Sequence, residues 1–181
     1  MNILLTETQI KKFLSHAELQ KLLYDMEQER LKKIHKNKKL YHFTKIFYFS
    51  DIIKNNFILK GSTSVSFTRN KNLNSDKTSI ITEVRIEIDR KKIEKKYNLE
   101  HYKDTYLDFN EEEERILLKD YPNGIDISDC IVKVTLKSLN YLEKKYSKYV
   151  DFKTKVKNDF YFIIKSLKKL KIPFDISDNF S

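Results

Sequence analysis

Three short segments of the sequence carry polar side chains where an apolar strand is expected to begin or end. They are residues 40–44 (LYHFT), residues 64–70 (SVSFTRN) and residues 111–118 (EEEERILL). The first contributes an imidazole, the second contributes hydroxyl groups and a guanidinium, and the third contributes a cluster of carboxylates. Crowded carboxylates repel one another, which raises some of their pKa values and leaves one ready to act as a base. Such a set is more typical of one reactive site than of packing.

Alternation along a strand predicts which of these side chains lie together. It places His42 and Leu40 on one face of the first segment, and Ser66 and Thr68 on one face of the second. Arg69 follows directly at the end of the second strand. A guanidinium can bind a pyrophosphate through two parallel hydrogen bonds, which the ammonium group of lysine cannot do.

Each segment also has a structural interpretation, which the sequence leaves open. His42 could be buried against the carbonyl group of a neighbouring strand. Ser66 and Thr68 could form the polar outer face of a half-buried strand. The four glutamates at 111–114 could form a solvated loop or the start of a helix, where negative charge is favourable against the helix dipole.

In this order the segments resemble the ADP-ribosyltransferase fold family. Members of that family often carry a Tyr-His-x-Thr string, as at residues 41–44, then a central Ser/Thr strand and a Glu-x-Glu pair before a later strand. Related phage-type sequences resemble Glu-x-Glu-Glu-Arg at residues 111–115, where Arg115 would pair with one carboxylate. The resemblance covers roughly residues 40 to 136. It implies mixed central β-sheets that bind NAD, which is the substrate of this family.

The resemblance implies a role for each segment. His42, Thr44 and Arg69 would hold NAD, while Ser66 and Thr68 would line the cleft. A glutamate would bind the ribose 2′-hydroxyl and place negative charge beside C1′, which develops oxocarbenium character as nicotinamide leaves. The candidates for this catalytic glutamate, with the first preferred, are Glu113, Glu111 and Glu114.

The predicted function is therefore an NAD-dependent mono-ADP-ribosyltransferase of phage or toxin type that modifies a macromolecule. The net charge of +10 makes nucleic acid, or a protein bound to it, the expected target. The alternative is a non-enzymatic nucleic-acid-binding or host-interaction protein, with basic faces near residues 32–39 and 165–171. A nuclease that uses His42 and the carboxylates is a third hypothesis. AT-rich coding sequence would also enrich lysine without any selection for binding.

Composition narrows the remaining possibilities. The 181 residues, 40% of them hydrophobic, predict one main domain with a sizeable core. Two glycines and the lack of any GxGxxG or GxxxxGK[ST] string argue against a glycine-rich phosphate loop.

A single cysteine, Cys130, excludes an internal disulfide and a cysteine-based zinc site, and we expect it to be a small buried hydrophobe. The histidine spacing predicts no metal site. No leader or membrane-spanning pattern occurs, so a soluble cytoplasmic protein is expected.

These patterns predict an α+β fold in two parts. A helical lead-in over residues 1–39 is expected to precede an ADP-ribosyltransferase-like domain over residues 40–181. Within the lead-in, the capping boxes Thr6/Gln9 and Ser15/Glu18 would each open a helix. The elements expected in the domain are a strand over 40–49, a helix over 51–56 capped by Ser50, a strand over 65–68, a strand over 79–88, a helix from Asp89 to about Tyr97, a strand over 115–118, a turn over 121–124, a strand over 131–136, a helix from Ser138 to Tyr146, a helix over 151–169 and an edge strand at 172–174.

Overall fold

A computed structural model describes residues 16–61, 63–69, 71, 83–101 and 113–178. The chain divides into two compact units, residues 1–37 and residues 38–181. This division falls close to the predicted boundary between residues 39 and 40. The predicted helix near Thr6 lies outside the described residues.

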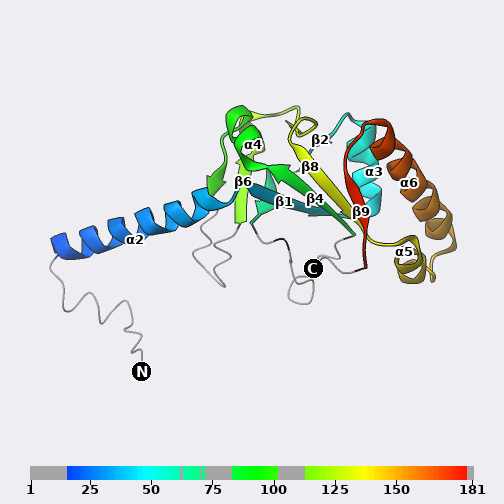
Figure 1. Ribbon diagram of the computed structural model, residues 1–181, viewed down its shortest axis with the longest axis horizontal. Helices are drawn as coiled ribbons and strands as arrows, with labels where there is room; N and C mark the ends of the chain where they lie inside the picture. Colours follow the sequence, from blue (N-terminus) through cyan, green and yellow to red (C-terminus); the bar gives the residue numbers. More distant parts are fainter. Residues whose placement is uncertain (1–15, 62, 70, 72–82, 102–112, 179–181) are drawn as a thin grey trace, which may run out of the picture. The chain divides into compact units, whose positions relative to one another are not determined.

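The first unit contains the predicted amphipathic helix, α2 (His16–Lys36) (Figure 1). Glu18 lies in its first turn and lysines occupy its last turns, which complements the helix dipole at both ends. Leu19, Leu22 and Met26 recur at helical spacing and form one apolar stripe. The prediction of a helix directly after Ser15 is therefore confirmed.

The second unit is built on a mixed β-sheet with helices beside it, so the α+β class is confirmed. Its described strands are β1 (Lys39–Thr44), β2 (Ile58–Leu59), β3 (Ser64–Thr68), β4 (Val84–Asp89), β5 (Glu100–His101), β6 (Glu113–Leu117), β7 (Ile125–Asp126), β8 (Ile131–Leu136) and β9 (Phe174–Ile176). Its described helices are α3 (Ile46–Lys54), α4 (Arg90–Lys96), the 3₁₀ turn η1 (Leu118–Asp120), α5 (Leu139–Lys145) and α6 (Val150–Lys169).

The main sheet has the strand order β5-β6-β3-β1-β4-β8-β9. Its neighbouring strands pair antiparallel, except for the parallel pair β8 and β9. The short strands β2 and β7 form a separate antiparallel pair. The strand that follows Pro173 lies at the edge of the main sheet, as predicted, with its bounds shifted to Phe174–Ile176.

One face of the main sheet carries the hydrophobic core. Val84, Ile86 and Ile88 alternate along β4 and are fully buried, whereas Arg85 and Glu87 between them point to the other face. The helices α3 and α6 lie side by side beside the sheet (Figure 1). They add to the same core the side chains of Ile46, Phe49, Ile53, Val156, Phe160, Ile163 and Leu167.

Local capping signals predicted two helices correctly. The Asp89 carboxylate accepts a hydrogen bond from the Lys92 amide at 3.1 Å, and α4 begins at the next residue. The Ser138 hydroxyl accepts one from the Tyr141 amide at 3.1 Å, and α5 follows. The predicted strand over 131–136 is β8 without any shift.

The prediction for residues 40–56 is wrong in its boundaries. The first strand ends at Thr44, and α3 has already begun at Ile46. The amide of Ile46 donates to Oε2 of Glu83 at 2.8 Å, so a carboxylate distant in sequence satisfies the helix start. Ser50 does not cap a helix. It lies buried inside α3, where its hydroxyl donates to Oδ1 of Asp159 at 2.7 Å.

Two further strands differ from the prediction in length. The strand expected over 115–118 is β6, which begins two residues earlier and gives way to η1 at Leu118. The strand expected over 79–88 is β4 at Val84–Asp89, and residues 79–82 lie outside the described part of the chain.

Candidate active site

The three polar segments lie on three neighbouring strands of the main sheet, in the order β6-β3-β1. Thr68 of the central strand pairs with Glu113 on one side and with Tyr41 on the other. Phe67 pairs with Glu114 in the next row. Strands that are far apart in the sequence therefore bring the predicted segments to one place in the sheet.

His42 occupies the core face of β1, and its imidazole bonds to the neighbouring strand. Its ring centroid lies 5.9 Å from that of Phe67, and its Nδ1 lies 2.9 Å from the backbone carbonyl oxygen of Ser66. Burial lowers the pKa of His42 below 6.5, and the bond to Ser66 opposes this shift only in part. A carbonyl can only accept, so the neutral ring carries its proton on Nδ1 and leaves the lone pair on Nε2. The structural interpretation of a histidine against a carbonyl group is thus observed.

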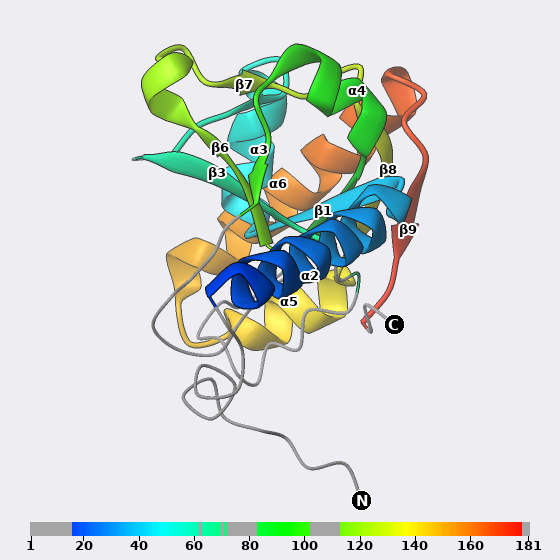
Figure 2. The same ribbon diagram turned by 90° about the vertical axis from the view of Figure 1, so that its left-hand side faces the viewer.

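The His42 bond marks the place where two strands separate. Among the described residues, β1 and β3 share one ladder pair, Tyr41 with Thr68. The imidazole then bonds to Ser66, in line with the need of buried carbonyl groups for a partner. Figure 2 shows β3 and β6 running at an angle to β1.

Ser66 and Thr68 do not share a face with His42. Along β3 the buried Val65 and Phe67 point to the core, so Ser66 and Thr68 point to the opposite face. Ser66 is half-buried and Thr68 is buried. The sheet register brings the strands together without placing the imidazole and these hydroxyl groups on the same side.

The remaining predicted residues are placed as follows. Thr44 is half-buried at the end of β1, and its carbonyl oxygen accepts from the Glu83 amide at 3.0 Å. Glu113 is the first residue of β6 and the register partner of Thr68. Glu111 lies outside the described residues.

Glu114 is the centre of a buried ionic cluster. Its Oε1 lies 2.9 Å from Nη1 of Arg90 and 3.4 Å from Nη1 of Arg69. Arg90 also donates from Nε to Oε1 of Glu94 at 2.6 Å. Burial raises the pKa of Glu114 above its ordinary value, although both guanidinium groups act in the opposite direction. The Glu114 carboxylate, near the start of β6, therefore binds both Arg69, at the end of β3, and Arg90, on α4.

Arg90 was not singled out by sequence reasoning. It belongs to α4, which lies outside the three polar segments in the sequence. Only the fold brings its side chain close to Glu114. A usable signal was the rarity of arginine in a chain whose positive charge is mostly lysine. Arginine is preferred where a buried carboxylate must be held from a fixed direction.

A second buried carboxylate, Glu83, was also missed. Its Oε2 accepts from the amide of Ile46, while its Oε1 accepts from the Tyr146 hydroxyl at 2.6 Å and pairs with Lys145. Burial and the Glu83 carboxylate raise the pKa of Tyr146. These contacts join Glu83, the residue before β4, to the start of α3 and to the end of α5. We therefore interpret this cluster as structural.

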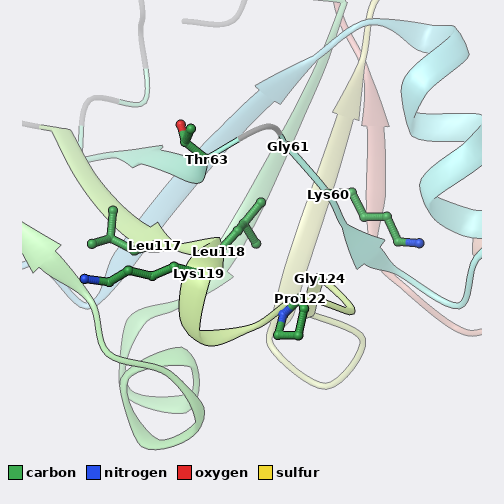
Figure 3. A pocket seen from close by; sticks show the side chains of 8 residues that line it. All are labelled: Lys60, Gly61, Thr63, Leu117, Leu118, Lys119, Pro122 and Gly124. Atoms are coloured by element: carbon green, nitrogen blue, oxygen red, sulfur yellow. The ribbon is translucent and has the colours of Figure 1, made fainter.

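A cavity of 540 Å³ opens beside the Ser64 and Leu117 ends of β3 and β6. Figure 3 shows the lysine side chains at its rim pointing in opposite directions. The predicted site residues that the structure describes do not line this cavity. Its lining consists of Lys60, Gly61, Thr63, Leu117, Leu118, Lys119, Pro122 and Gly124.

Three further features concern the described residues. No group of three or more His, Cys, Asp or Glu side chains among them is arranged to hold a metal ion. None of the described helices combines the length and the apolar character that crossing a membrane requires. Cys130 is fully buried, and burial raises its pKa to about 11, which makes it a poor nucleophile and confirms it as a small core residue.

Comparison of the sequence with protein-family models found no match, and comparison with the curated proteins found none either.

Proposed function

We propose that this chain is an NAD-dependent mono-ADP-ribosyltransferase that modifies a macromolecular target. The observation that carries the proposal is the register of the central strand, in which Thr68 pairs with Tyr41 on β1 and with Glu113 on β6. β1 and β6 thus flank the Ser/Thr strand from its two sides, with Glu113 beside Thr68 in the register. Because neighbouring strands lie about 4.8 Å apart, the backbones of β1 and β6 are about 10 Å apart across β3.

Each group has a distinct task in the proposed reaction. The His42 ring lies on the opposite face of the sheet from Thr68, so we assign it to holding β1 against β3 through its bond to Ser66 rather than to contact with the ribose. Glu113 would bind the 2′-hydroxyl of the nicotinamide ribose. Arg69 and Glu114 form an ion pair at the ends of their strands, and we assign them to positioning Glu113. Thr68 would line the cleft beside Glu113.

The proposed reaction is a substitution at C1′ of the nicotinamide ribose. The bond from C1′ to the nicotinamide nitrogen breaks, and nicotinamide leaves with the bonding electron pair. A nucleophilic atom of the target forms a new bond to C1′ and loses its proton to solvent. The Glu113 carboxylate would stabilise the positive charge that develops on the ribose between these events.

Release of free nicotinamide from NAD by the full chain tests the proposal, with and without nucleic acid. Removing a group that stabilises developing charge costs roughly 100-fold or more in kcat. We expect Glu113→Gln to slow release by at least this factor, and the double variant with Glu111→Gln to abolish it, both without a change in thermal stability.

Glu143→Gln on α5 is the matched control, since it removes the same charge from a half-buried position on another element. It should leave release unchanged. Full activity in the double variant, or no release by the unmodified chain with any nucleic acid or cell extract as acceptor, would contradict the proposal.

A further inference from the structure

Four aromatic rings from two parts of the chain contact one another beyond the end of β1. Phe47 of α3 lies 5.3 Å from Tyr146 and 5.6 Å from Phe152 between ring centroids. Tyr146 and Phe152 are stacked, with 10° between their planes and 6.2 Å between centroids. Tyr149 meets Phe152 edge-on at 5.8 Å. We call these four residues the ring cluster.

The ring cluster is exposed on its outer side. Tyr149 is 59% exposed and Phe152 is 45% exposed, while Phe47 and Tyr146 are half-buried beneath them. Phe152 has no polar group to direct to water, so its exposure is costly unless another molecule covers it. Contiguous exposed rings of this kind are typical of a binding surface.

Lysine side chains flank the ring cluster. Nζ of Lys155 lies 4.9 Å from the ring centroid of Phe47, and Nζ of Lys145 lies 5.3 Å from that of Tyr146. Residues 139–155 contain five lysines against two acidic residues, the half-buried Glu143 and the exposed Asp151. Lys145 is paired with Glu83, so four lysines against two acidic residues remain, and the surface combines stacking area with a local excess of positive charge.

We infer that the ring cluster is a binding surface for single-stranded nucleic acid. Exposed rings provide faces on which unpaired bases stack, and lysines neutralise the phosphates between them. A duplex would not fit this surface as well, because its bases are already stacked and their faces are covered. The positive groups around the cluster are lysines, so recognition should depend little on base sequence. The inference does not rest on the NAD reaction, and it holds equally for a protein without enzymatic activity.

Fluorescence anisotropy with a labelled oligothymidylate, and with the same strand annealed to its complement, tests this surface. The full chain is used without NAD over a series of salt concentrations. Tyr149→Leu and Phe152→Leu each remove a ring and keep an apolar side chain. The control is Tyr161→Leu, which removes a tyrosine ring that is 54% exposed on the same helix and contacts Phe160 rather than the ring cluster.

Each ring substitution should weaken binding to the single strand by about fivefold or more, and the duplex should bind more weakly than the single strand. Lys148→Gln and Lys155→Gln should reduce the slope of log Kobs against log salt by up to about 0.7 each. These lysine variants keep the test decisive if a ring variant fails to fold. Glu113→Gln should bind the single strand as tightly as the unmodified chain does. Strand binding does not require the NAD reaction, so the two proposals can fail separately.

Several outcomes would overturn the inference. They are failure to bind either oligonucleotide, tighter binding of the duplex, or an equal loss of affinity in Tyr161→Leu. Binding of poly-glutamate with the same dependence on Tyr149 and Phe152 would also overturn it, and would assign the surface to an acidic protein.

Discussion

The imidazole of His42 bridges β1 and β3, since its Nδ1 lies 2.9 Å from the backbone carbonyl oxygen of Ser66. His42 is one residue beyond Tyr41 of the ladder pair Tyr41 with Thr68, and Ser66 is two residues from Thr68. A side chain thus contributes to the connection between two strands of the candidate site. The stability of that connection should depend on the protonation state of the ring.

His42 should make the protein less stable as the pH falls. Burial lowers the pKa of the folded state below 6.5, the ordinary value, so the unfolded chain binds more protons in this range and the free energy of unfolding rises with pH. The free energy of unfolding should decrease as the pH falls from about 6.5 to the lower pKa that His42 has in the folded protein. Denaturant titrations of the unmodified chain and of His42→Asn should differ in this window, because Asn can donate to Ser66 without titrating. Identical pH profiles would contradict the assignment.

Glu114→Gln should destabilise the protein strongly. It removes the charge that lies between the guanidinium groups of Arg69 and Arg90, whose side chains are 8% and 3% exposed. Breaking a buried pair by removing one partner costs about 3 kcal/mol. Urea unfolding measures this loss. Glu94→Gln removes the outer carboxylate, whose side chain is about one third exposed, and should cost less than about 1 kcal/mol. Equal effects of the two variants would show that burial of Glu114 is unimportant.

Tyr146→Phe should weaken the attachment of α5 to the start of β4. It removes the hydroxyl that donates to Glu83 at 2.6 Å and keeps the ring contacts with Phe47 and Phe152. Loss of a hydrogen bond to a charged group costs about 2 kcal/mol, which denaturant unfolding would detect. Tyr141→Phe, at an exposed tyrosine on α5, should change stability by less than about 0.5 kcal/mol. If Tyr146→Phe left the free energy of unfolding unchanged, Lys145 and the Ile46 amide would be sufficient partners for the Glu83 carboxylate.

Gly124→Ala should be destabilising through the backbone of the turn before β7. Gly124 has φ of +92°, and a Cβ there would lie 2.6 Å from Cγ2 of Ile58 and 2.7 Å from the Leu59 carbonyl oxygen. Both the strained backbone and the close contacts act against alanine, so we expect a loss of more than about 1 kcal/mol in thermal or urea unfolding. A change within about 0.5 kcal/mol would indicate that the turn adapts freely.

Local sequence patterns were sufficient to predict the elements whose start and periodicity depend on neighbouring residues. Asp89 and Ser138 cap α4 and α5 through amides three residues further along the chain, so the signal and the structure lie in the same short segment. Residues 131–136 show the alternation of a strand and form β8. The sequence also identified the three polar segments that lie on β1, β3 and β6.

The way in which these elements meet depends on contacts between residues that are far apart in the sequence. The start of α3 depends on Glu83, which is 37 positions away, so local rules misplaced the helix and assigned Ser50 to its cap. The register of β3 decided that Ser66 and Thr68 face away from His42, and packing of α4 brought Arg90 to Glu114. A periodic pattern predicts the two faces of one strand, but it contains no information about the pairing that aligns one strand with the next. The geometry of the candidate site is therefore a property of the assembled sheet.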